Sequence, residues 1–258
     1  MIFADLSYQQ WAVFLLVLLR CSTLMATLPF FGSPNLPPLA KAGLSLALAV
    51  LLTPVVPVRA EQFPTTAPGF ALLAAGEMAI GAIFGLSVRL LLTAVQIMGQ
   101  LVGYQMGFAV ANVIDPIGGG QVSVLAQFAF LMSLLTLFAV DAHHWFFRAL
   151  ADSFRLVPPG RFAVNRSLFQ QMVNISGQMF SLSVRLGAPV IGALLFTQVV
   201  MGILAKTVPQ MNILMVGFPI TITVGLVFLA LALTYMLPAL ARVFAGFGPM
   251  FTALMRGM

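Results

Sequence analysis

The chain has 258 residues, of which 61% are hydrophobic and only 7% are charged. With a mean hydropathy of +1.07, this composition excludes a soluble globular protein and is typical of an integral membrane protein. The net charge of +6 comes from basic and acidic residues scattered thinly along the chain. Because no basic stripe alternates with aromatic residues, we expect no nucleic acid partner.

Long apolar segments recur along the chain. They cover residues 11–31, 42–58, 70–88, 90–114, 122–140, 186–205 and 207–241. Several reach the length of about 18 residues that a membrane-spanning helix needs. Backbone groups in lipid must bond within their own segment, which favours helices. The sequence therefore predicts an all-α, polytopic membrane protein with about six to seven hydrophobic helices, interrupted by proline and glycine breaks.

Glycines recur at helical spacing in two of these segments. Gly99, Gly103 and Gly107 are four residues apart, and Gly81 and Gly85 repeat the spacing in the preceding segment. Residues four apart share one helix face, so these glycines predict a close approach of another helix backbone. The spacing alone leaves open whether that helix belongs to this chain or to a partner.

A helix break follows the second glycine group. Asp115 and Pro116, then Ile117 and the run Gly118, Gly119 and Gly120, oppose helix formation. Irregular backbone at membrane depth occurs only where protein buries it or it lines a cavity. The apolar side chains around the break can seal a pore by excluding water, and these are Met106, Phe108, Val110, Val113, Ile114 and Ile117. An ordinary external loop between two spans is the alternative.

Four charges lie within or beside apolar segments, namely Arg20, Glu77, Arg89 and Arg185. A charge at the bilayer centre costs about 2.5–3.5 kcal/mol on insertion scales. We therefore expect each of them to pair with another group or to face water, and we predict Arg20, Glu77 and Arg185 as the buried charges. Arg20 and Glu77 are the single charges of segments 11–31 and 70–88, which predicts an ion pair between them.

The usual catalytic motifs are absent from the sequence. It contains no nucleotide-binding P-loop, no G-x-S-x-G elbow and no H-E-x-x-H pair. Asp141, His143 and His144 are the nearest approach to a metal-ligand cluster, but adjacent side chains on a helix point about 100° apart. The sequence predicts no catalytic residues, no cofactor and no metal site.

Two sequence stretches carry the most specific motifs of the chain, and these are GYQMGFAVANVIDP (103–116), followed by VSVLAQF (122–128), and VPQMNILMVGFPITITVG (208–225). Both stretches resemble the FliR family of membrane proteins of the flagellar export gate. HHWFFRALADSFRLVP (143–158) adds support, and the similarity covers essentially the whole chain. Counterparts in injectisomes, the related type III secretion machines, tend to have arginine where this chain has Met106. The resemblance therefore favours the flagellar branch.

The resemblance implies a non-enzymatic subunit of the type III protein export gate in the bacterial inner membrane, at the flagellar basal body. One such subunit would complete a helical ring with FliP and FliQ, near FlhB and FlhA, and unfolded flagellar proteins would pass through its centre. Residues 106–122 would form the central plug loop of a single domain. Within that domain, residues 1–185 would resemble FliP and residues 186–258 a FliQ hairpin with a C-terminal tail.

A secondary transporter for a small solute is the alternative function. Broken helices and charges inside the membrane are features of such transporters. The chain shows neither an inverted repeat nor a clustered polar site, so the gate subunit is the preferred interpretation.

Overall fold

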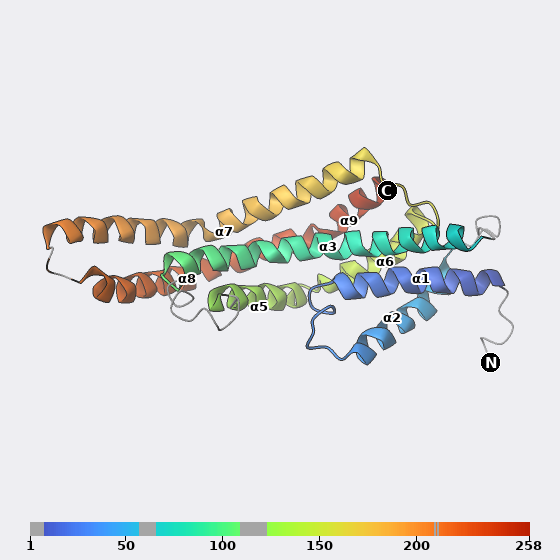
Figure 1. Ribbon diagram of the computed structural model, residues 1–258, viewed down its shortest axis with the longest axis horizontal. Helices are drawn as coiled ribbons and strands as arrows, with labels where there is room; N and C mark the ends of the chain where they lie inside the picture. Colours follow the sequence, from blue (N-terminus) through green and yellow to red (C-terminus); the bar gives the residue numbers. More distant parts are fainter. Residues whose placement is uncertain (1–7, 57–65, 109–122, 209, 211) are drawn as a thin grey trace. The chain divides into compact units, whose positions relative to one another are not determined.

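The computed structural model describes residues 8–56, 66–108, 123–208, 210 and 212–258. Figure 1 labels the helices and colours them along the sequence from blue to red. All regular structure in the described residues is helical. The helices are α1 (Tyr8–Thr27), α2 (Pro38–Leu52), the short 3₁₀ helix η1 (Thr53–Val55), α3 (Ala67–Gln105), α5 (Val124–Ala139), α6 (His143–Leu156), α7 (Arg166–Thr207), α8 (Ile213–Ala245) and α9 (Phe247–Arg256). The prediction of an all-α polytopic membrane protein is confirmed.

Four described helices are long and apolar enough to cross a membrane, or up to five if α5 and α6 count as one broken span. Two predicted spans, 70–88 and 90–114, are joined in the 39-residue helix α3, because a single exposed Arg89 does not interrupt a helix. The predicted span 42–58 yields only the 15-residue α2, which begins at Pro38 and is shorter than the roughly 20 residues that a crossing needs.

The helices form two compact units that interleave along the chain. The first contains Met1–Leu90, Ala142–Ile175 and Gly246–Met258, and the second contains Leu91–Asp141 and Ser176–Ala245. The long helices α3 and α7 each contribute residues to both units, and α7 lies mostly in the second.

An aromatic cluster forms the core of the first unit. The ring of Phe251 from α9 lies 5.3 Å from that of Phe84 in α3 and 6.1 Å from that of Phe146 in α6, measured between centroids. Phe247 adds a further contact to Phe146 at 5.6 Å. All four side chains are buried, so α9 is fixed to this unit by rings that fill the space between three helices.

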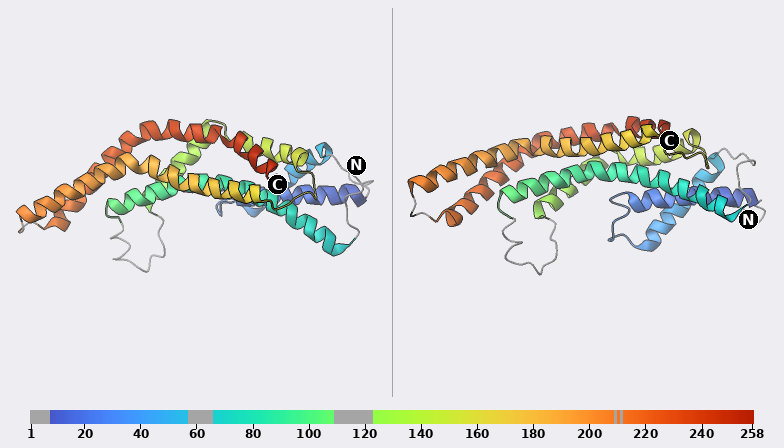
Figure 2. Two further views of the ribbon diagram at one scale, coloured as in Figure 1. Left: turned by 90° about the horizontal axis from the view of Figure 1, so that it is seen from above. Right: turned by 45° about the horizontal axis from the view of Figure 1, so that its top comes forward.

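The second half of α7 and helix α8 form a long hairpin, visible in both views of Figure 2 as neighbouring orange and red ribbons. Pro189 lies inside α7 and cannot donate to the carbonyl of Arg185 four residues earlier. The hydroxyl of Tyr235 from α8 lies 3.2 Å from that carbonyl and 2.6 Å from the carbonyl of Leu186. A side chain of one helix therefore supplies the donor that proline removes from the other.

Candidate functional site

Helix α3 ends in a Schellman motif directly before the predicted plug. Its last helical residue is Gln105. The amide of Gly107 donates to the carbonyl of Tyr104 over 3.1 Å, and the amide of Phe108 donates to the carbonyl of Gly103 over 3.1 Å. Gly107 has a φ of 94°, the left-handed conformation that glycine adopts most readily at this position.

This ending corrects one sequence prediction. Gly107 does not continue the helical packing face of Gly99 and Gly103, because the helix has already ended and its backbone turns at Gly107. A glycine at the end of an apolar helix is also a common helix stop signal. In the structure Gly107 is such a helix stop, which the regular four-residue spacing did not indicate.

Helix α8 holds the end of α3 in place. The side chain of Met106 is fully buried and lies against Gly225, where a β-carbon would clash with it. The Thr221 hydroxyl shares its proton between the carbonyl of Met106, at 3.3 Å, and carbonyls of its own helix. A methyl group on Gly107 would lie 2.6 Å from the ring of Phe218.

Phe218, Thr221 and Gly225 were not predicted as site residues. They lie in the stretch 208–225 that carries the family resemblance. Sequence reasoning gave this stretch no contact role, because nothing in a single sequence indicates that residue 106 and residue 225 meet.

A cavity of about 450 Å³ lies beside this contact, between the end of α3, α7 and the start of α8. The side-chain amide of Gln198 donates to the carbonyl of Gln105 over 3.3 Å. The amide oxygen of Gln105 is buried without a hydrogen-bond partner among the described residues. The backbone before the predicted plug is therefore held by a hydrogen bond from Gln198 of α7 as well as by α8.

The predicted plug residues divide into two groups. Met106 is buried against α8, whereas the side chain of Phe108 is 41% exposed. The remaining predicted residues lie outside the described part of the chain, and these are Val110, Val113, Ile114, Asp115, Pro116, Ile117, Gly118, Gly119 and Gly120.

The other predicted packing glycines lie at close helix contacts. A methyl group on Gly99 would lie 2.7 Å from the Cα atom of Ala126 in α5, and one on Gly103 would lie 2.6 Å from the hydroxyl of Ser123. In the first unit, a methyl group on Gly81 would lie 2.6 Å from the carbonyl oxygen of Arg20 in α1. Gly85 of α3 faces the side chain of Thr27, which also belongs to α1.

Arg20 and Glu77 form a buried ion pair in the first unit, with a nitrogen-to-oxygen distance of 2.6 Å. Arg20 also donates to the Ser153 hydroxyl over 2.9 Å and to the carbonyl of Val157 over 3.1 Å. Its guanidinium carbon lies 4.2 Å from the ring centroid of Phe154. The network joins α1, α3 and α6 and compensates both charges, as a buried charge in an apolar protein requires.

The prediction that Arg185 is buried is wrong. Its side chain is exposed, on the face of α7 that also exposes Ser181. The opposite face of the helix, with Ser183, Leu186 and Val190, is the one buried in the second unit. The apolar composition of the segment could not show which way this arginine points.

His143 and His144 begin helix α6, and their ring centroids are 4.2 Å apart. The argument that adjacent side chains point away from each other is therefore wrong at this helix start. The broad side-chain torsions of histidine let neighbouring rings meet.

Comparison with known proteins identifies the family. Residues 11–247 match the model of bacterial export proteins, family 1. The chain is 32% identical over 237 residues to the flagellar biosynthetic protein FliR of Bacillus subtilis, covering 90% of both chains. It is 32% identical to FliR of Pectobacterium carotovorum, covering 88% of this chain and 86% of the relative, and 28% identical to FliR of Escherichia coli, covering 88% and 87%. The chain therefore belongs to family 1 of the bacterial export proteins, the family of the flagellar biosynthetic protein FliR.

Proposed function

We propose that this protein is a non-enzymatic subunit of the flagellar type III protein export gate. It acts in the bacterial inner membrane at the base of the flagellum, where it forms and plugs the secretion channel together with FliP and FliQ. FlhB and FlhA lie nearby, and unfolded flagellar proteins are the cargo. Family membership and the apolar helices support this role.

The fixed end of α3 is the observation that supports the plug most directly. The proposed plug, residues 106–122, starts at Met106, where the Schellman motif and helix α8 set the position and direction of the backbone. A segment that closes a channel needs a rigid attachment, because a loose attachment would let it leave the pore without cargo. The buried Met106 and the Gly107 turn supply that attachment.

Exposed apolar surfaces support the proposed partners. Large apolar side chains on α7 and α8 are exposed, among them Phe180, Phe196, Ile203, Met215 and Leu231. Exposed patches of this kind mark surfaces that lipid or another protein covers. We propose that FliP and FliQ cover part of them, and that residues 186–258 act as the FliQ-like portion of the ring.

The structure gives the transporter alternative little support. Among the described residues of the first unit, the buried charges Arg20 and Glu77 are paired with each other, and Arg20 also donates to Ser153 of α6. They therefore offer no open site to a solute.

Removal of residues 114–120 tests the plug. We expect cells that produce this deletion to become permeable to small solutes and ions while the complex still assembles. A second variant, in which a glycine-serine linker of equal length replaces these residues, should also leak, because it keeps chain length but removes the apolar side chains. Normal permeability in either variant, with the complex assembled, would contradict the plug.

A further inference from the structure

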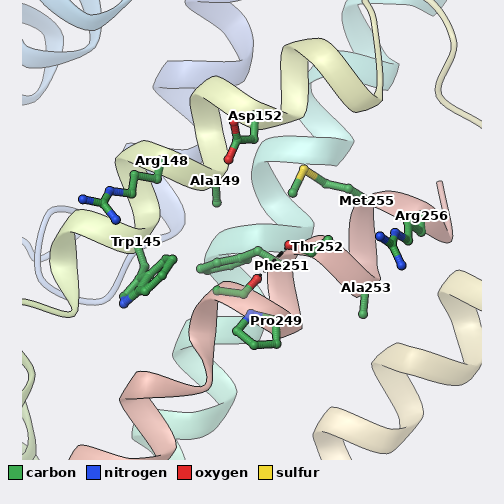
Figure 3. Close-up of a pocket in the computed structure, with 11 residues that line it drawn as sticks. Trp145, Arg148, Ala149, Asp152, Pro249, Phe251, Thr252, Ala253, Met255 and Arg256 are labelled. Atoms are coloured by element: carbon green, nitrogen blue, oxygen red, sulfur yellow. Dashed lines mark hydrogen bonds between the residues drawn. The ribbon is translucent and has the colours of Figure 1, made fainter.

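A second cavity, of about 600 Å³, lies in the first unit between helices α6 and α9. Figure 3 shows the side chains around it: Trp145 and Arg148 stand at one side, Arg256 at the other, and Phe251 lies between them. Phe251 and Met255 are buried and form an apolar floor. Tryptophan, arginine, phenylalanine and methionine are the residue types enriched where proteins bind each other. The lining therefore has the composition of a protein-binding surface.

Both cavity helices belong to segments that are apolar and long enough to span a membrane. Helix α9 ends a continuous candidate span, Met215–Arg256, and α6 is the second part of a broken span that begins with α5. Charged side chains in such segments pair with one another or face water. Arg148, Asp152 and Arg256 are exposed, and none of them forms an ion pair with another described residue. They are therefore open to a charged group from another molecule.

Positive charge exceeds negative charge on the surface of the first unit. Among the described residues of this unit, Asp152 is the one exposed acidic side chain, and the exposed basic side chains are Arg89, Arg148, Arg155, Arg161, Arg166 and Arg256. The guanidinium carbon of Arg148 lies 5.4 Å from the ring centroid of Trp145, a cation–π contact that holds it at the cavity. The basic surplus is complementary to carboxylates, and the apolar floor is complementary to an apolar side chain.

We propose that this cavity is the docking site for an acidic segment of a partner protein, in which an apolar side chain stands between two carboxylates. The apolar side chain covers Phe251 and Met255, one carboxylate pairs with Arg148, and the other pairs with Arg256. Asp152 lies four residues after Arg148 on the same face of α6, where its carboxylate accepts a backbone amide of the segment. The site is independent of the plug, which belongs to the second unit.

Peptide binding to the solubilised full-length chain tests this site. Because the protein contains two tryptophans, Trp11→Phe leaves Trp145, which lines the cavity, as the only one. The probe is a short synthetic peptide in which a leucine stands between two pairs of aspartates, and the matched peptide has asparagine in place of every aspartate. We expect Trp145 fluorescence to report about tenfold tighter binding of the acidic peptide, about threefold from each ion pair. Equal affinities, or no binding of the acidic peptide, would overturn the proposal.

Charge variants in the same background separate a defined site from a general attraction of acids to a basic protein. Arg148→Gln and Arg256→Gln, on different helices, should each lower the affinity for the acidic peptide about threefold. Arg155→Gln is the matched control: Arg155 is an exposed arginine of α6 that does not line the cavity, and its loss should leave the affinity unchanged. An equal loss of affinity in Arg155→Gln would overturn the proposal.

A lipid in the cavity is the competing outcome. The same single-tryptophan protein is reconstituted into phosphatidylcholine vesicles in which a fixed fraction of either phosphatidylglycerol or phosphatidylcholine carries brominated acyl chains. We expect both brominated lipids to quench Trp145 equally, because the cavity selects a protein segment and not an anionic lipid. Stronger quenching by brominated phosphatidylglycerol, lost in Arg148→Gln, would assign the cavity to a lipid and overturn the proposal.

Discussion

Gly107 is the residue where the backbone of α3 turns, and its conformation makes a strong prediction. In Gly107→Ala, an L-residue must adopt a left-handed conformation that costs about 1–2 kcal/mol, and its methyl group meets the ring of Phe218. We expect the free energy of unfolding to fall by at least that amount, and closed-gate permeability to rise as the plug attachment loosens.

Thermal unfolding of the solubilised full-length chain and an ion-leak measurement check this prediction. Gly177→Ala is the control, because Gly177 lies in helix α7 with open space around it. Alanine is the better helix former, so that variant should be unchanged or more stable by up to about 1 kcal/mol. Equal stability of the two variants would show that the Gly107 turn contributes nothing.

The Arg20–Glu77 pair makes a second prediction at the scale of single residues. Removal of one partner, as in Arg20→Met or Glu77→Met, leaves an uncompensated buried charge and should cost about 3–5 kcal/mol of stability. The double variant should recover a large part of that loss, since no charge is then buried alone. A double-mutant cycle on unfolding midpoints measures the coupling. Additive losses would mean that the two charges do not depend on each other.

Helix contacts through glycine lead to a prediction about which glycines tolerate alanine. A methyl group on Gly99 meets the backbone of α5, which cannot move away, whereas one on Gly103 meets the hydroxyl of Ser123, which can rotate. Gly99→Ala should therefore separate α3 from α5 and reduce the yield of assembled complex, and Gly103→Ala should assemble almost normally. Gly103→Leu should fail, because its larger side chain finds no room. The reverse order of the two alanine variants would contradict this packing.

Individual elements show what the sequence could reveal and what it could not. Composition and segment length correctly predicted an apolar helical protein, because lipid imposes helices on any spanning backbone. The same reasoning divided α3 at Arg89, since hydropathy registers a charge without showing that its side chain is exposed at the helix surface. The apolar segment 42–58 is not one helix either: α2 ends at Leu52, and the short 3₁₀ helix that contains Pro54 follows it, within the break that proline predicted there.

At the scale of the whole molecule, the limit of sequence reasoning is contact between distant residues. The Arg20–Glu77 pair could be predicted because each residue is the single charge of its apolar segment and the two segments are neighbours in the sequence. The third and fourth members of that network, Ser153 and Val157, gave no such signal. Nor did the contact between Met106 and Gly225, because a methionine and a glycine are common in any apolar helix.

The central claim, that this protein is one subunit of a heteromeric export gate, is tested most directly by its mass in a native complex. The full-length tagged chain is produced together with FliP and FliQ from the same organism, extracted in mild detergent and measured by native mass spectrometry. We predict a large complex that contains all three proteins and a single copy of this chain. A homo-oligomer of this chain alone, with FliP and FliQ present but unbound, would contradict the account and favour the transporter.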